Sequence, residues 1–244
     1  MANASHEMRT PVTVERAILQ VALADPDATA DTLRSACEQA LTSGEQQERL
    51  IEALLTLASS ERGLDRREPF DLAAVTENVL QSRRQAAHRR GVDLRTVLRP
   101  AFALGDPELA RSLVANLVDN ALRYNVEQGW VEVVTHEIPG GAEVAVRNPG
   151  PAVPVEEVAR LFRPFQRLER GRTRHATGHG LGLAIVSAIA SAHGAGLRAR
   201  PRPTGGLDIE VHFRTSMPDR NGSARQAPRE PRADPATNTH RGPA

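Results

Sequence analysis

The sequence predicts an α+β fold in which a helical hairpin precedes a mixed region of helices and strands, and three observations lead to this prediction. Residues 1–63 carry apolar side chains at helical spacing. The charged segment from Arg66 to Pro69 then interrupts the pattern. Beyond it, helical patterns alternate with short runs that are typical of strands. We therefore expect a helical unit at 1–65, an α+β unit at 66–215 and, where Pro, Arg and Asn dominate without periodicity, a disordered tail at 216–244.

The N-terminal unit is expected to consist of two amphipathic helices joined by a short loop at Asp25 to Asp27. Apolar residues mark one face of the first helix: Met8, Val12, Leu19 and Leu23. The second helix begins at the capping residues Thr29 to Asp31 and ends near Gly63, with a weak point at Thr42 to Gly44 that could kink it. A hairpin of this size cannot bury its apolar stripe alone, so it should pair with a second copy into a four-helix bundle or dock on the rest of the chain.

The α+β unit is predicted from helical and strand patterns that are separated by turn residues. Its expected elements are, in order, a helix at 71–90 ended by Gly91, strands at 92–98 and 102–104, a helix that begins at Asp106, a hairpin of strands at 130–138 and 143–147, a helix at 155–162, a polar loop at 167–179, a helix at 182–193, and a final hairpin at 197–213 that turns at Thr204 to Gly206. No segment recurs along the chain, which excludes a repeat architecture.

The helix that begins at Asp106 carries both an apolar stripe and a pair of asparagines, and the other motifs are interpreted in relation to it. Asp106 can cap it, and Pro107 occupies its first position. An apolar stripe recurs every fourth residue: Leu109, Leu113, Leu117 and Ala121. Asn116 and Asn120, also four residues apart, share another face. Such a pair either supplies neutral oxygen ligands for Mg²⁺ and a phosphate chain or is simply solvated, and this segment alone leaves both interpretations open.

Three further segments carry residues suited to chemistry, each with an ordinary alternative. Gly178 to Leu183 opens a helix with glycines, where bare amides can bind phosphate, although a plain loop-to-helix turn has the same pattern. Asn148 to Pro154 follows a strand and either contacts the edge of a base or forms a turn. Ser5 to Pro11 places His6 beside a carboxylate, and a neutral imidazole is a nucleophile as well as a base.

Composition narrows the function classes. The formal net charge of +1 and the aromatic content of 3% give no indication of nucleic-acid binding. The single cysteine, Cys37, excludes an internal disulfide, fits a reducing compartment and, within an apolar helical pattern, is expected to fill a core. The chain has no apolar run of about 18 residues and no signal peptide, so we expect a cytoplasmic chain without a membrane segment.

Taken together, five motifs in this order resemble the cytoplasmic core of the bacterial sensor histidine kinases of two-component systems. They are an H box at Ser5 to Pro11, an N box at Asn116 to Asn125, a G1 box at Asn148 to Pro154, an F box at Leu161 to Phe165 and a G2 box at Gly178 to Leu183. The resemblance covers about residues 3–213. It implies a dimeric helical hairpin, which forms a four-helix bundle in the dimer, followed by an α/β-sandwich ATP-binding domain of the gyrase, Hsp90 and histidine kinase type.

The resemblance also implies an activity, that of an ATP-dependent protein-histidine kinase. His6 would attack the γ-phosphate of ATP, become phosphohistidine and pass the phosphate to an aspartate of a response regulator. Glu7 would act as the general base for His6. Thr10 would orient the water that removes phosphate from the partner regulator.

The other implied roles concern ATP and Mg²⁺. Asn116 and Asn120 would hold the metal and the phosphates. Phe162 and Phe165 would anchor a lid at 166–179. The nucleotide itself would contact Arg123 and Tyr124 from the N box, Asn148 and Gly150 from the G1 box, and Gly178, Gly180, Leu181 and Gly182 from the G2 box.

The sequence departs from the family pattern in the G1 box, which normally begins with an Asp that accepts a hydrogen bond from the adenine amino group. Here the residue is Asn148, whose amide oxygen can accept the same bond without a charge, and Ala152 replaces a second glycine. Because Gly150 is kept, we expect an intact site that binds ATP more weakly by about 1 kcal/mol.

The start of the chain is a second departure, since only five residues precede His6, whereas family members have a sensor, membrane helices and a linker upstream. This favours a truncated reading frame, a start-site error or a free-standing soluble kinase, and a truncated chain would have a parent anchored in the plasma membrane. Three other functions stay open. One is a phosphatase or inactive fragment that binds ATP without autophosphorylation, and another is an interaction module with no nucleotide, against which Asn116 and Gly182 argue. The third is a serine kinase of the same ATP-binding superfamily, which would have no use for the motif around His6.

Overall fold

The structure is a computed structural model of the chain, and it describes residues 16–17, 19–61, 64, 66–166 and 180–215. Several expectations fall outside these residues: Met8 and Val12 of the first helix, the polar loop at 167–179 and the disordered tail at 216–244. Within the part that the structure describes, no helix is both long enough and apolar enough to cross a bilayer.

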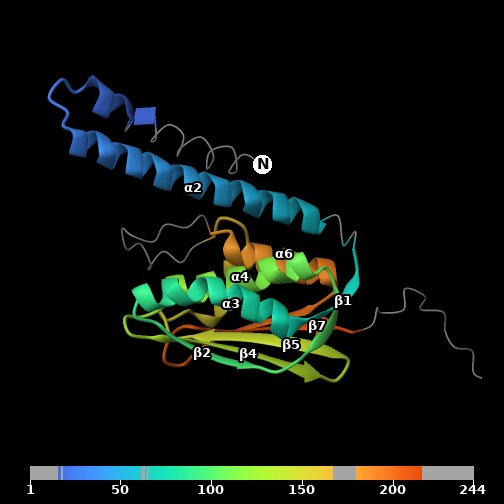
Figure 1. The fold of residues 1–244 in the computed structure, drawn as a ribbon. Coiled ribbons are helices and arrows are strands. Elements are labelled where there is room, and N and C mark those ends of the chain that lie inside the picture. The colour runs from blue at the N-terminus through green and yellow to red at the C-terminus, as the bar shows by residue number, and fades with distance from the viewer. Residues whose placement is uncertain (1–15, 18, 62–63, 65, 167–179, 216–244) are drawn as a thin grey trace, which may run out of the picture.

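The N-terminal unit is a helical hairpin, as the sequence predicts. Residues 16–17 and 19–24 are helical, and α2 (Ala30–Glu61) follows after a short turn. α2 then packs against α6 (Gly182–His193) of the second unit, above the layer of helices that covers the sheet (Figure 1).

α2 is one continuous helix of 32 residues. Thr29 Oγ1 accepts a hydrogen bond from the Thr32 amide at 3.2 Å and thereby caps its start. The helix runs through the expected weak point at Thr42 to Gly44 without interruption. The expectation that Cys37 fills a core is wrong for the single chain, because Cys37 lies exposed while Ala36 and Ala40 of the same helix are buried.

The second unit is an α/β sandwich, which confirms the predicted fold class. One sheet has the strand order β2-β4-β5-β7-β6, with β2 and β4 parallel and the other neighbours antiparallel: β2 (Asp93–Leu98), β4 (Trp130–Ile138), β5 (Gly141–Asn148), β6 (Gly196–Pro201) and β7 (Leu207–Arg214). Figure 1 shows α3 (Leu72–Arg89), α4 (Pro107–Arg123) and α6 on one face of this sheet. The helix expected at 155–162 is a short α5 (Val155–Val158) continued by the 3₁₀ turn Ala159–Phe162.

A strand that the sequence did not predict opens the second unit. β1 (Glu68–Asp71) pairs antiparallel with β3 (Phe102–Gly105) in a separate two-stranded sheet. Asp71 Oδ1 accepts hydrogen bonds from the amides of Ala73 at 2.9 Å and Ala101 at 3.1 Å. One carboxylate thus caps α3 and fixes the chain just before β3, the strand with which β1 pairs.

The core lies between the inner face of the sheet and the helices, and α4 occupies its centre. The predicted stripe is confirmed at Leu113, Leu117 and Ala121, while Leu109 is only partly buried. α4 buries a second row as well, made of Ala110, Val114, Val118 and Leu122. The second row is buried because α4 packs against both α3 and α6 in addition to the sheet.

His193, the last residue of α6, joins the end of that helix to the start of α4. Its ring is buried, Nδ1 donates to the Ile189 carbonyl at 2.9 Å, and Nε2 accepts a hydrogen bond from the Asp106 amide at 3.1 Å. The neutral imidazole with its proton on Nδ1 makes both of these hydrogen bonds. The Asp106 carbonyl oxygen also lies 3.3 Å from Nε2, but burial outweighs it and lowers the pKa of His193. A Cβ on Gly105 would collide with this ring, so glycine is required where the chain enters α4.

Candidate nucleotide-binding site

Asn116 and Asn120 lie on α4, which begins where the sequence predicts. Asp106 Oδ1 accepts hydrogen bonds from two amides of the first helical turn at 2.8 and 3.1 Å. Both asparagines are partly buried. Asn116 Nδ2 donates to the Ser112 carbonyl at 2.8 Å, which leaves the Asn116 Oδ1 as the atom available to a ligand.

The N-terminus of α6 lies beside Asn116. A Cβ on Gly182, the first residue of α6, would stand 3.3 Å from Asn116 Oδ1, so the N and G2 boxes predicted from the sequence meet. No described side chain caps α6, whose first amides therefore lack the partner that a cap supplies. The Leu181 side chain is 4% exposed and belongs to the core, so only its backbone can serve a ligand. A carboxamide oxygen beside bare helix-terminal amides suits a phosphate chain and its counter-ion.

Backbone contacts hold the two ends of the predicted lid together. The Phe165 amide donates to the Gly180 carbonyl at 3.1 Å. Gly180 has a φ of +67°, and a Cβ there would come within 2.8 Å of the Gln166 carbonyl oxygen, so glycine is required. Phe165 itself has a φ of +61° and packs with Phe162 against the core, while their role as anchors of the lid stays a prediction. The rest of the lid, with Gly178, lies outside the described residues.

Asn148 ends β5, and it is 5% exposed. Its Nδ2 donates to the Pro149 carbonyl at 2.8 Å. None of the described residues donates a hydrogen bond to Asn148 Oδ1, which therefore keeps the acceptor capacity that the sequence predicts for it.

Gly150 lies between the end of α4 and the β6–β7 turn. A Cβ on Gly150 would collide with the carbonyl oxygen of Tyr124, the C-cap residue of α4. Gly205 and Gly206 approach from the turn with φ values of +90° and +92°, and the Gly206 amide donates to the Pro151 carbonyl at 3.1 Å. The sequence predicts a turn at these two glycines but not their contact with the G1 box, because that contact depends on how β5 and β7 pair.

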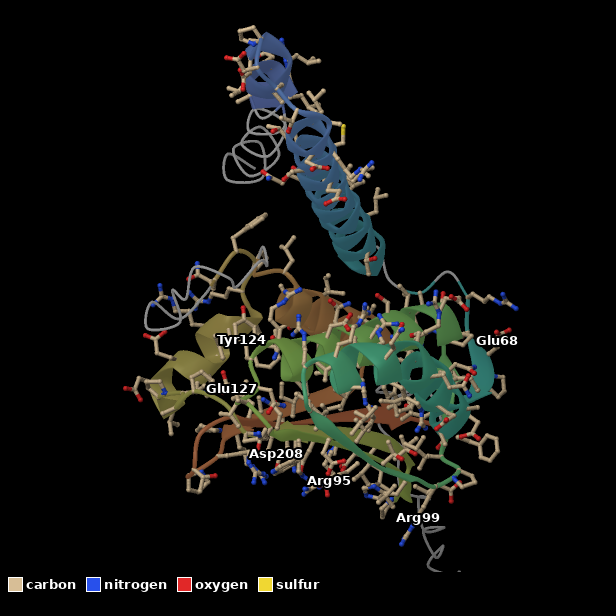
Figure 2. The ribbon with its side chains drawn as sticks, turned by 60° about the vertical axis from the view of Figure 1, so that its left-hand side comes forward. Glu68, Arg95, Arg99, Tyr124, Glu127 and Asp208 are labelled. Atoms are coloured by element: carbon tan, nitrogen blue, oxygen red, sulfur yellow. The ribbon has the colours of Figure 1, made fainter. Side chains whose placement is uncertain are left out.

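The end of α4 places the remaining residues of the N box. Arg123 is exposed in the last helical turn, and Figure 2 shows Tyr124 at the C-terminal end of the helix. Asn125 Nδ2 donates to the carbonyls of Ala121 at 3.1 Å and Trp130 at 3.0 Å, which closes the helix and ties it to the start of β4.

The predicted site residues divide into two sets. The structure brings together Asn116 with Gly182 and Tyr124 with Gly150. The phosphotransfer residues His6, Glu7 and Thr10 lie outside the described part of the chain, so their relation to this site stays a prediction.

Two family models match the sequence. Residues 1–63 match the His Kinase A (phospho-acceptor) domain, and residues 105–217 match the histidine kinase-, DNA gyrase B- and HSP90-like ATPase. The sensor protein CutS of Streptomyces coelicolor is 42% identical over 212 residues, which are 86% of this chain and 51% of CutS. The chain thus spans about half the length of the curated relatives it matches.

Two solved structures share the fold. The histidine kinase AdeS of Acinetobacter baumannii superposes with a TM-score of 0.66 at 24% identity, over 87% of this chain and 98% of that chain. The histidine kinase ThkA, crystallised in complex with the response regulator TrrA, has a TM-score of 0.65 at 20% identity, over 88% of this chain and 60% of that one. With the two family matches and the likeness to CutS, these findings show that the chain belongs to the sensor histidine kinase family, with a phospho-acceptor helical domain followed by a histidine kinase-type ATPase domain.

Proposed function

We propose that the chain is an ATP-dependent protein-histidine kinase core, which phosphorylates its own His6 and passes the phosphate to an aspartate of a response regulator. The observation that carries this proposal is the close approach of Gly182 to Asn116 Oδ1, which a Cβ on Gly182 would meet at 3.3 Å, at the start of α6, where no described side chain caps the helix. It joins an oxygen ligand for a cation to amides that bind phosphate, which is what nucleotide binding in this family requires. Membership of the sensor histidine kinase family supports it.

The nucleotide would be held at both of its ends. Asn116 and Asn120 would bind Mg²⁺, which neutralises phosphate charge, and the first amides of α6 would bind the phosphates. At the other end, Asn148 Oδ1 would accept a hydrogen bond from the adenine amino group. Gly150 would leave room for the base beside Asn148. A side chain at this position would collide with the Tyr124 carbonyl oxygen and displace the end of α4. Arg123 and Tyr124 would contact phosphate and adenine, as the resemblance implies.

The transfer step needs a nucleophile and a base. A neutral nitrogen of His6 would form the bond to the γ-phosphorus while the bond to the β–γ bridging oxygen breaks and ADP leaves. Glu7 would accept the second imidazole proton, which keeps the other nitrogen nucleophilic. In the opposing reaction, which removes phosphate from the regulator, Thr10 would orient the water that hydrolyses the phosphoaspartate.

A homodimer is part of the proposal. The helical hairpin exposes large apolar side chains in the single chain: Val21 is 71%, Leu23 79% and Leu41 70% exposed. A second hairpin would cover them in a four-helix bundle, together with Cys37. We extend the proposal to the division of the chain into a hairpin at 1–65, an ATPase domain at 66–215 and a tail at 216–244.

The proposed partner is a response regulator, as in the complex of ThkA with TrrA. We place the reaction in the cytoplasm, where ATP is supplied. A regulator phosphatase that binds ATP without autophosphorylation is the second candidate, and Asn148 at the position of the usual Asp favours it because the adenine contact lacks a charge.

Incubation of the full chain with γ-labelled ATP and Mg²⁺ tests the first function. We expect label that is lost in acid and stable in base, as phosphohistidine is, and that is absent from His6→Gln. The matched control is His88→Gln, because His88 is an exposed histidine on α3, outside the proposed machinery. Label that persists in His6→Gln would contradict the assignment of His6. Saturable ATP binding without any label would favour the phosphatase.

A further inference from the structure

The face of the sheet that points away from α3, α4 and α6 carries ordered rows of charged side chains. One row crosses four strands as Arg95, Glu132, Arg147 and Asp208. Arg147 contacts Glu132 at 2.8 Å and Asp208 at 3.2 Å, and these carboxylates raise the pKa of its guanidinium. Figure 2 shows Arg95 and Asp208 on this side of the sheet. In this row each carboxylate faces a guanidinium.

A second row on the same face has a different composition. His136 of β4, Glu143 of β5 and His212 of β7 are direct neighbours across the strands. Glu143 Oε1 lies 3.8 Å from His136 Nε2, and Glu143 Oε2 lies 2.5 Å from His212 Nε2. The Glu143 side chain is 11% exposed. Its partners here are therefore two imidazoles, one on each side, instead of guanidinium groups.

A second carboxylate converges on the same point. Glu210 precedes His212 by two residues on β7 and so points to the same face. The ligand atoms of Glu143, Glu210 and His212 all lie within 4.8 Å of one another. His212 Nε2 is shielded from solvent and forms no aligned hydrogen bond within the described residues, although it touches Glu143. This ring nitrogen therefore lies at the point where Glu143 and Glu210 converge.

We propose that Glu143, Glu210 and His212, with His136 as a fourth ligand, bind a divalent transition-metal ion of the Zn²⁺ class on the outer face of the sheet. Imidazole and carboxylate ligands suit Zn²⁺, whereas Mg²⁺ and Ca²⁺ prefer oxygen alone. Ligands about 2.1 Å from a tetrahedral ion stand about 3.4 Å apart. The observed separations among Glu143, Glu210 and His212, from 2.5 Å to within 4.8 Å, bracket that value, so side-chain rotation can bring these three ligands onto one ion. His136 Nε2, which lies 3.8 Å from Glu143 Oε1, would rotate to join them.

The position of the site determines what the ion would do. Glu143 and Asn148 lie near opposite ends of β5, separated by five residues or roughly 17 Å of strand, so the metal would not touch the nucleotide. It would instead join β4, β5 and β7 through their side chains and stabilise the sheet. Arg198 lies across from Glu210 on β6, and its charge opposes cation binding.

Chelator competition with Zn²⁺ on the full chain tests the proposal, with Co²⁺ absorption as a report on tetrahedral geometry. We expect the wild type to bind one more equivalent than His212→Ala, or to bind that equivalent at least tenfold more tightly. His88→Ala is the matched control, because His88 is an exposed histidine on a helix of the same domain and should change nothing. The comparison between variants is necessary because the chain has eight histidines.

A second variant distinguishes the loss of a metal ligand from a failure to fold. Glu210→Gln keeps the side-chain volume at a partly exposed position, so it should fold as the wild type does yet bind Zn²⁺ more weakly. Arg198→Gln should bind more tightly. Zn²⁺ should raise the Tm of the wild type and of His88→Ala, but not that of His212→Ala. Equal Zn²⁺ affinity in the wild type, Glu210→Gln and His212→Ala, or a Tm that Zn²⁺ does not move, would overturn the proposal.

Discussion

Replacing Gly182 by alanine should weaken MgATP binding while leaving the fold intact. The new Cβ would stand 3.3 Å from Asn116 Oδ1, closer than the 3.4 Å at which ordinary contacts begin. The amide cannot turn away freely, because its Nδ2 is bonded to the Ser112 carbonyl at 2.8 Å. We therefore expect Asn116 Oδ1 to shift by roughly a few tenths of an ångström.

Such a shift matters for the metal and not for stability. Mg²⁺ requires near-octahedral oxygens at about 2.0–2.1 Å, so a displaced oxygen is lost as a ligand. Loss of an interaction worth about 1.5–3 kcal/mol corresponds to about 10- to 150-fold weaker binding of MgATP. Gly182 is in helical geometry, where alanine stabilises by about 0.4–1 kcal/mol through the unfolded state.

Calorimetric titration with ATP in Mg²⁺ and in EDTA, together with thermal melting, measures both effects. Gly182→Ala should lose affinity in Mg²⁺, change little in EDTA and melt at or above the wild-type temperature. Gly196→Ala is the control, since its Cβ would lie 3.6 Å from His212 Cβ, an ordinary contact in the same domain. Unchanged MgATP affinity in Gly182→Ala, or an equal loss in EDTA, would refute Asn116 as the metal ligand.

Three further changes probe the rest of the domain. Asn148→Asp should tighten ATP binding by about 1 kcal/mol, roughly fivefold in calorimetric titration, because a carboxylate is the stronger acceptor for the adenine amino group; weaker binding would contradict the proposed contact. Gly150→Ala should lower stability by about 1–3 kcal/mol in denaturant unfolding, because the new Cβ collides with the Tyr124 carbonyl, and wild-type stability would contradict the packing described. Burial lowers the pKa of His193, so below about pH 6.5 the unfolded chain binds more protons than the folded one, and stability is lost as the pH falls. His193→Gln should reduce this loss of stability, measured as the free energy of unfolding from pH 7 to about pH 5. If the variant loses as much stability as the wild type over this range, other titrating groups cause the pH dependence.

Elements with strong local signals could be predicted closely from the sequence. The bounds of β4 (Trp130–Ile138) and α6 (Gly182–His193) are those expected from alternation and helical spacing. α4 begins where Asp106 caps it, and α6 ends where Gly194 adopts a φ of +63°. These signals act within a few residues of the boundary, so the sequence alone contains them.

Features that depend on distant partners could not be predicted. β1 contains Pro69 and is too short for an alternation pattern, and its pairing with β3 is what orders it. The contact of Gly206 with the G1 box arises because β5 and β7 pair in the register that places Asn148 opposite Leu207. Cys37 is exposed although the apolar pattern predicts that it is buried, because helical spacing alone does not show which apolar face the hairpin buries within one chain.

Titration of the full chain with MgATP, followed by competition with ADP and GDP, tests the central claim that Asn116, Gly182 and Asn148 form one adenine nucleotide site. We predict one saturable site per chain, displaced by ADP and not by GDP, because guanine has no amino donor at the position where Asn148 Oδ1 would accept one. Asn116→Ala should weaken MgATP binding at least about tenfold. Absence of saturable binding at millimolar ATP, or undiminished affinity in Asn116→Ala, would contradict the account.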